Sequence, residues 1–378
     1  MTTFAVHERV DEQLRREWHD LAERVGTRFA SRPSYGLAWH AHLARGPLRV
    51  ATVHRGGRLV ALLGLHRRRR LGVPVLRLLG HGLGTVGEAL ADDDGALADL
   101  VDGLACSGAV LELTHLPLNS PLAAAVGAHP RWRTTLTGDD HCPVIELPPG
   151  TRAADLRSRS TLSRAASTRR KLAREGRELV TETVRTPDQF DHRWPEIVRT
   201  AAAAGTGEAE YRLNLCAPPH DAFTHDFLRQ EAENGHLLLW GATFGGDWGA
   251  HFATLATGSR AELWFTRFHP AYRRIRPGHH LIEAVCDQHD DLGITEVDLL
   301  IGRSGYKADW QTHEYAVGTL VATPVGRPDA RWQMTAVDRG VDLLRRAGTS
   351  ARTAPDRARD ALAWFRSRRS SSTGDSAP

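Results

Sequence analysis

The stretch AELWFTRFHPAYRRIRPGHHLIEAVCDQHDDLGITEVDLLIGRSGYKADW, residues 261–310, decides the fold that this sequence predicts. Its pattern is typical of a strand (261–269), a basic turn, a helix (277–292), a second strand (295–301) and a polar turn with Tyr306 and Lys307. A turn between a strand and a helix points backbone N–H groups at a bound anion. The stretch therefore predicts a site for a phosphate-bearing ligand.

The side chains of the basic turn support this prediction. Pro277 suits the first turn of a helix, and Gly278 lets a ligand approach the backbone closely. The guanidinium groups of Arg273, Arg274 and Arg276 are suited to a pyrophosphate or a 3′-phosphate. Basic turns before helices are common, so the turn alone does not specify the ligand.

The elements around this stretch predict the fold class. Upstream we expect strands at 179–184, 236–244 and 248–257 and helices at 188–203 and 222–234; downstream we expect a short helix and a strand at 315–323. The order is strand, two helices, three antiparallel strands, helix, strand, short helix and strand. It predicts an α+β fold with a mixed, mostly antiparallel sheet flanked by helices.

Residues 1–150 form a first half that ends at Pro-Pro-Gly. Its patterns predict helices at 11–26, 37–44 and 94–106 and strands at 3–10, 48–54, 59–66, 75–79, 109–113 and 143–147. Residues 151–178 then carry nine basic and three acidic residues, which predicts one or two basic helices. Such a segment can be a solvated linker or can face phosphates. Helices at 330–346 and 355–368 and a disordered Ser-rich end are predicted for the tail.

Composition narrows the class of protein. A hydrophobic fraction of 41% and a charged fraction of 25% are those of a soluble globular protein. No apolar run approaches the roughly 18 residues of a membrane span, and the charged N-terminus lacks a signal-peptide core, so we expect a cytoplasmic protein. The four cysteines and 20 histidines show no metal-ligand or disulfide spacing, so no metal is predicted. Composition does not predict the oligomeric state.

Lysine is almost absent. Of the 49 lysines and arginines, only Lys171 and Lys307 are lysine, a bias typical of GC-rich codons. A lysine that persists can mark a place that needs a compact ammonium, which the planar guanidinium of arginine does not replace. Chance explains either lysine equally well.

Two strings within this stretch carry a family resemblance. The chain resembles the GNAT acyltransferases in two strings: Trp264-Phe265-x-x-Phe268-His269-Pro270-x-Tyr272-Arg273-Arg274-x-x-Pro277-Gly278 and Asp298-Leu299-Leu300-x-Gly302-x-x-x-Tyr306-Lys307-x-x-Trp310. Within that superfamily they look like the cellulose-biosynthesis-associated (CelD/BcsL-like) branch, which is related to Fem-type peptidyltransferases. One departure is that Pro277-Gly278-His279-His280 lacks the second small residue of the general Gln/Arg-x-x-Gly-x-Gly/Ala loop.

The resemblance implies two tandem GNAT-like domains. It is clearest over residues 156–321 and includes the basic helix at 162–176. Residues 1–150 fit as a degenerate GNAT-like domain, 151–325 as the acyltransferase domain and 326–378 as a helical tail.

The implied activity is transfer of an acyl group from acetyl-CoA or another acyl-CoA to an amine of a small molecule or saccharide precursor. The strand at 263–268 is expected to splay from its parallel neighbour at 296–300, so that pantetheine bonds the exposed backbone. The implied cofactor-binding residues are Phe265, Arg267, Phe268, Arg273, Arg274, Arg276, Pro277, Gly278 and His279.

Four residues are catalytic candidates under this resemblance. Tyr306 is the first candidate for stabilising the leaving thiolate, and Lys307 for stabilising the oxyanion or binding an acceptor carboxylate. Asp298 is a candidate base or acceptor anchor, and His251 an alternative base. Each has an ordinary structural alternative: Asp298 as an arginine partner, Tyr306 as a packing aromatic, His251 as a buried sheet histidine. Trp264 and Trp310 are expected in the core.

Two other functions remain open from the sequence. The basic helix favours a Fem-type transferase that uses aminoacyl-tRNA, with tRNA as a partner. A binding module for a polysaccharide or lipid-linked precursor would have no turnover. A P-loop and a nucleophile elbow are both absent from the sequence, since Tyr306 stands where the elbow needs glycine.

Overall fold

The computed structural model describes residues 1–26, 28–70, 72–204, 213–302 and 305–326. In it the strands of both halves join in one sheet. The first half contributes β1 (Thr2–His7), β2 (Leu48–Arg55), β3 (Arg58–Arg70), β4 (Val73–Leu78), β5 (Leu90–Ala91), β6 (Val110–Pro117) and β7 (Trp132–Glu146). The second contributes β8 (Leu179–Val184), β9 (Leu237–Phe244), β10 (Asp247–Thr257), β11 (Arg260–Phe268), β12 (Glu296–Asp298) and β13 (His313–Pro324).

The helices lie between these strands in the sequence. The first half has α1 (Glu12–Val25), a 3-10 turn η1 (Phe29–Ser31), α2 (Pro33–Leu43), α3 (Asp94–Cys106) and α4 (Pro121–Ala128). The second has α5 (Ala153–Leu156), α6 (Arg159–Arg174), α7 (Pro187–Ala204), α8 (Asp221–Glu233), η2 (Pro270–Ile275), α9 (Pro277–Gln288) and α10 (Tyr306–Trp310). The predicted basic segment is thus a helix pair, α5 and α6.

The sheet is mixed and mostly antiparallel, which confirms the predicted α+β class. Its order is β1-β2-β3-β4-β6-β13-β7-β12-β11-β10-β9-β8, with β5 paired to β3. The pairs β4–β6 and β11–β12 run parallel. Residues 1–69 and 74–325 form one compact unit. Arg70–Val73 group with the segment from Gly326 in a second unit, which lies mostly outside the described residues. The predicted helices at 330–346 and 355–368 and the predicted disordered end also lie outside them.

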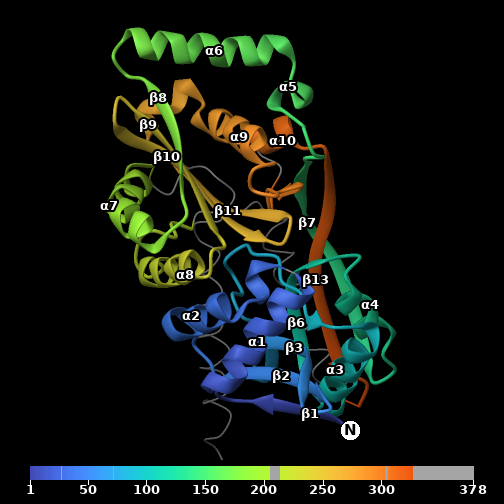
Figure 1. Ribbon diagram of the computed structural model, residues 1–378. Coiled ribbons are helices and arrows are strands. Elements are labelled where there is room, and N and C mark those ends of the chain that lie inside the picture. The colour runs from blue at the N-terminus through green and yellow to red at the C-terminus, as the bar shows by residue number, and fades with distance from the viewer. Residues whose placement is uncertain (27, 71, 205–212, 303–304, 327–378) are drawn as a thin grey trace, which may run out of the picture. The chain divides into compact units, whose positions relative to one another are not determined.

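The two halves repeat one order of elements and exchange their last strands. In both halves the order is strand, two helices, three strands, helix, strand, helix and strand. It runs from β1 to β7 in the first half, if the short β5 is left out, and from β8 to β13 in the second. However, β7 pairs with β12 of the second half, and β13 pairs with β6 of the first. Figure 1 shows β7 and β13 side by side, and they pair with each other from Trp132↔Pro324 to Val144↔His313.

The structure corrects the prediction for residues 117–147. Only a short strand at 143–147 is predicted there, but the structure has α4 and a 15-residue β7. Ser120 caps α4, since its hydroxyl accepts a hydrogen bond from the amide of Ala123 at 2.9 Å. The length of β7 depends on its distant partner β13, which local sequence does not reveal.

Helices from both halves share a core on one face of the sheet. One buried cluster contains side chains from four helices: Leu14, Trp18 and Leu21 of α1, Tyr35 and Trp39 of α2, Ile197 of α7, and Phe223 and Phe227 of α8. The rings of Tyr35 and Phe227 meet edge to face at 5.1 Å. On the other face α3 and α4 cover the first half, and α9 covers the second. The shared core therefore holds the two halves together.

A buried ion pair reinforces this contact between the halves. The Arg32 guanidinium lies 2.5 Å from the carboxylate of Glu231 on α8, and the Ser34 hydroxyl donates to the same carboxylate at 2.6 Å. Both charged side chains are almost fully buried. Among the helices that the structure describes, none is both long and apolar enough to cross a membrane.

Candidate functional site

The candidate site begins where β11 and β12 diverge. Their parallel pairing ends at Glu262↔Asp298. β11 then continues along β10 to Phe268, whereas the amide of Leu299 donates to the carbonyl of Pro143 on β7 at 2.9 Å. Leu300 adopts a left-handed φ of 53° as the chain turns away. The expected splaying of these strands is confirmed, and it leaves one edge of β11 without a strand partner beyond Glu262.

Two cavities open along this free edge. The cleft cavity, of about 180 Å³, lies between β11 and residues 300–302. The turn cavity, of about 240 Å³, lies between β10, β11 and the start of α9. Thr266, Arg267 and Tyr306 line both. A ligand of two parts could therefore reach from one cavity to the other past Tyr306.

The turn cavity is shaped by the basic turn. Arg276 caps α9 in a left-handed conformation (φ 57°), and Arg273, Arg276 and Gly278 line the cavity. A Cβ placed on Gly278 would lie 3.4 Å from Tyr306 Cδ1, so any longer side chain would enter the cavity. Trp310 Nε1 donates to Nδ1 of His279 at 3.1 Å and fixes that ring in the wall. The cavity thus combines the free amides of a first helical turn with arginine side chains, and both bind anions.

The predicted cofactor residues gather at these cavities with one exception. Arg267, Phe268, Arg273, Arg276, Pro277, Gly278 and His279 line the turn cavity. Phe265 lines the cleft cavity, and the exposed Arg274 lines neither. Trp264, expected in the core, is buried and also forms part of the cleft wall.

Tyr306 separates the two cavities. Its ring stacks on Phe252 at 5.4 Å, and its hydroxyl is buried. Thr266 lies beside the hydroxyl, but no group among the described residues has hydrogen-bond geometry to it. Burial raises the pKa of Tyr306, so the phenol keeps its proton at neutral pH. A proton donor without a partner is thus aimed at the space between the cavities.

Lys307 stabilises the turn that follows β12. Its ammonium donates to the carbonyl of Ile301 at 2.8 Å and lies 3.4 Å from that of Leu300. Its side chain also lines the cleft cavity. Three donors on one ammonium permit both roles, holding the backbone and facing a ligand.

Asp298 lies behind this turn, fully buried, and lines neither cavity. Its carboxylate accepts hydrogen bonds from Arg28 at 2.7 Å, from the Tyr315 hydroxyl at 2.6 Å and from the Leu300 amide at 2.8 Å. These contacts match the arginine-partner alternative for Asp298. The carboxylate therefore holds Leu300 in its left-handed conformation.

Arg28 also binds the neighbouring carboxylate on β11. Its guanidinium lies 2.9 Å from Glu262, which accepts a second hydrogen bond from the amide of Phe29 at 2.7 Å. Burial raises the pKa of Glu262, and the charge of Arg28 offsets part of this rise. Arg28 thus joins the last paired residues of β11 and β12 from the first half of the chain. No local pattern in the sequence singles out Arg28, which is 270 residues from Asp298.

His251 is placed differently. It is fully buried on β10, lines neither cavity, and accepts a hydrogen bond at Nδ1 from Trp248 Nε1 at 3.3 Å. Burial, with the nearby Arg267, lowers the pKa of His251 to about 3. In this arrangement the ring stays neutral and its basic nitrogen is already occupied. The structure thus brings Tyr306 and Lys307 together at the cavities, but not Asp298 or His251.

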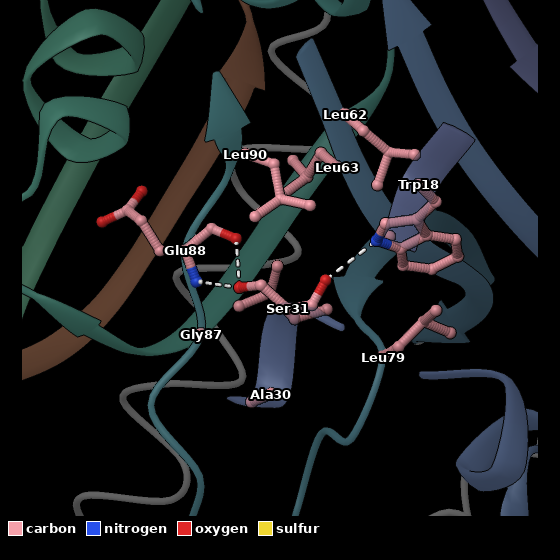
Figure 2. A pocket seen from close by; sticks show the side chains of 11 residues that line it. Trp18, Ala30, Ser31, Leu62, Leu63, Leu79, Gly87, Glu88 and Leu90 are labelled. Carbon is pink, nitrogen blue, oxygen red and sulfur yellow. Dashed lines mark hydrogen bonds between the residues drawn. The ribbon is translucent and has the colours of Figure 1, made fainter. Parts of the chain in front are cut away.

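A much smaller cavity lies in the first half. It has about 10 Å³ beside β3 and β4 and room for no more than a water. Figure 2 shows Trp18 and Leu79 lining it and Ser31 bonded to Glu88. The indole of Trp18 donates to the carbonyl of Ser31 at 2.9 Å (Figure 2). The first half instead contributes Leu83 and Gly84 to the cleft cavity of the second.

A family model covers the segment that builds the site. Residues 159–308 match the model described as the acetyltransferase (GNAT) domain. This segment has the fold of the GNAT domain. No curated protein sequence matches the chain. Among the described residues, no three His, Cys, Asp or Glu side chains form a metal-binding group.

Three solved structures share the fold of most of the chain. FemX aligns with 87% of this chain and 99% of its own, at 9% identity and a TM-score of 0.57. The C-terminal DUF2156 domain of a protein assigned as a lysylphosphatidylglycerol synthetase from Agrobacterium fabrum covers 86% and 95%, at 14% identity and 0.53. A conserved protein of unknown function from Bacteroides thetaiotaomicron covers 85% and 100%, at 8% identity and 0.51. At these identities the likeness concerns the fold alone.

Proposed function

We propose that the chain is a cytoplasmic, acyl-CoA-dependent N-acyltransferase of the CelD/BcsL-like branch. In this proposal residues 1–150 and 151–325 are its two GNAT-like domains, and the second carries the active site. The observation that carries the proposal is the divergence of β11 from β12 beside the basic turn, with Tyr306 in the wall of both cavities. Acyl-CoA would supply an acyl group activated as a thioester.

The residues of the site fit such a donor. The amides at the start of α9, with Arg273 and Arg276, would hold the pyrophosphate. The end of the open edge of β11 that faces the turn cavity, at Thr266 to Phe268, would hold the pantetheine amides. Among the described residues the buried hydroxyl of Tyr306 is a proton donor without a hydrogen-bond acceptor, as a departing thiolate needs. Lys307 would keep the backbone at 300–302 in place beside the reacting groups.

Calorimetric titration with acetyl-CoA tests the cofactor. We expect one site per folded chain, with affinity that survives moderate salt because part of the contact is made by backbone amides. The full chain, checked for folding by circular dichroism, should be used. A folded chain that binds neither acetyl-CoA nor longer acyl-CoAs would remove the cofactor from this proposal.

Two arginines of the same turn provide a matched comparison. Arg273→Ala is expected to weaken acetyl-CoA binding about 10-fold, because a hydrogen bond to a charged group contributes about 1.5 kcal/mol. Arg274→Ala should leave the affinity unchanged, since Arg274 is exposed and lines neither cavity. Titration calorimetry of both variants at one salt concentration measures the difference. Equal losses in the two variants would show that only general charge at the turn matters.

The exposed basic face of α6 supports a second candidate, the Fem-type transferase that uses aminoacyl-tRNA. Only Leu172 of α6 is buried, and α6 lies at the top of the view in Figure 1, while Arg159, Arg164, Arg170, Lys171 and Arg174 are exposed. The fold likeness to FemX agrees with it. Binding of tRNA should then weaken steeply with salt, because phosphate contacts release counterions. A tRNA affinity that does not change between low and moderate salt would exclude this candidate.

A non-catalytic binding module is the remaining alternative. Any acylated amine seen by mass spectrometry would exclude it.

A further inference from the structure

The cleft cavity is rich in hydrogen-bond donors. Arg267 and Lys307 line it, and so do the Trp264 indole and the Tyr306 hydroxyl, both buried and without a hydrogen-bond partner among the described residues. None of the described residues that line the cavity is acidic. Buried donors left unpaired are costly, so this wall is suited to a ligand that brings acceptor oxygens.

Arg267 is the cation that most needs such a ligand. Its guanidinium donates to the carbonyl oxygens of Thr266, at 2.7 Å, and of Leu213. Within the described part of the chain it forms no ion pair, and burial lowers its pKa. Glu262 and Asp298 do not compensate it, because both are bound by Arg28 and by backbone amides behind the cavity wall. A partly buried guanidinium whose partners among the described residues are carbonyl groups favours an anionic ligand.

Most of the remaining wall is apolar. Apart from Thr266 and two glycines, its described residues are five leucines, Phe265 and Ile301. A sugar would bury hydroxyl groups against these side chains without partners, at a cost in free energy. The volume of about 180 Å³ is below the roughly 300–1,000 Å³ of drug-sized sites. The cavity therefore suits a small ligand with an apolar body and one anionic group.

We propose that the acceptor is a small apolar α-amino acid, bound in the cleft cavity with its carboxylate at Arg267. This inference rests on the proposed N-acyltransferase function and replaces a saccharide by an amino acid as the acceptor class. The amine nitrogen forms a bond to the acyl carbon and the bond from carbon to sulfur breaks. The nitrogen loses one proton, the sulfur gains one, and the products are an N-acyl amino acid and free CoA thiol.

An acceptor panel tests this with the unmodified full chain and acetyl-CoA. We expect L-leucine and L-phenylalanine to react with kcat/KM roughly 10-fold or more above L-leucinamide, 3-methylbutylamine and glucosamine, because only the first two present a carboxylate to Arg267. Mass spectrometry of the products gives the rates. Leucinamide or glucosamine reacting as well as leucine would overturn the proposal.

A binding measurement separates this inference from the proposed function. Titration of L-leucine and L-leucinamide into the chain without acyl-CoA should show binding of the acid only. If leucine binds in this way but acetyl-CoA does not, the cavity assignment stands and the acyl-CoA proposal fails. If acetyl-CoA binds and neither leucine nor phenylalanine binds or reacts, the amino-acid assignment fails alone.

Variants on one strand locate the carboxylate. Arg267→Gln should reduce the preference for leucine over leucinamide to about one, since the ratio cancels any change in acyl-CoA binding. Arg260→Gln on the same strand should keep the preference, because Arg260 pairs with Glu296 and lines neither cavity. An Arg267→Gln chain that folds and keeps the full preference would overturn the role of Arg267. If it does not fold, the acceptor panel on the unmodified chain decides.

Discussion

Arg28→Met is expected to lower the free energy of unfolding by about 3–5 kcal/mol. The guanidinium is the shared partner of Glu262 and Asp298, which face each other across the last register pair of β11 and β12. Removing it leaves two carboxylates together in the interior, which costs far more than removing a surface pair. At about 2 °C per kcal/mol for a chain of this size, the Tm should fall by roughly 6–10 °C.

The effect of Arg28→Met should also depend on pH. Burial already raises the pKa of Glu262, and losing Arg28 raises it further. A carboxyl whose folded pKa exceeds its unfolded value binds its proton more tightly when folded, so stability falls as pH rises through that interval. The variant should therefore lose more stability at pH 8 than at pH 5 relative to the parent.

Two further variants control this experiment. Arg229→Met removes an exposed arginine paired with Asp191 and Glu233 and should change the free energy of unfolding little, because exposed ion pairs are screened by solvent. Adding Glu262→Gln to Arg28→Met should recover part of the loss, because one buried charge disappears. Thermal and urea unfolding at two pH values measures all three. A loss for Arg28→Met no greater than that for Arg229→Met would show that the buried charges are not coupled.

Tyr306→Phe is expected to lower kcat about 100-fold, the lower range for a positioned proton donor. The ring and its stacking on Phe252 are retained, so the Kd for acetyl-CoA should stay within about 2-fold of the parent. The hydroxyl is buried without a partner, and its removal should not destabilise the fold. Initial rates at saturating acetyl-CoA, together with a thermal melt, separate these quantities.

Tyr272→Phe is the matched control for Tyr306→Phe. Its buried ring stacks on Phe244 at 3.9 Å, and Tyr272 lines neither cavity. Its kcat should equal that of the parent. A kcat for Tyr306→Phe that also equals the parent's would mean that Tyr306 only packs between the cavities, and another donor would then have to protonate the thiolate.

Local sequence predicts most of the second half, because its elements have strong periodicity and clear turn residues. The strand at 179–184 matches β8 residue for residue, and in the first half the helix at 94–106 matches α3 in the same way. The strand predicted to end at 301 ends at Asp298 instead, since residues 299–302 bend towards β7 and bond its backbone. Boundaries set by distant partners are outside the reach of a local pattern.

The same distinction holds for the candidate site. The basic turn, Tyr306 and Lys307 could be predicted because strand, turn and helix follow one another within 50 residues. The surroundings of Asp298 depend on Arg28 from the first half, and the pKa of His251 depends on burial by its neighbours in the folded sheet. The roles of all four catalytic candidates stay predictions until the variants are measured.

The exchange of β7 and β13 has a consequence for biosynthesis. Pro117 on β6 pairs with Val317 on β13, exactly 200 residues later in the chain. At about 5–20 residues per second, roughly 10–40 s pass on the ribosome before that partner is made. During this time one edge of β6 can pair with another nascent chain. The first half thus completes its sheet only after β13 of the second half has been made.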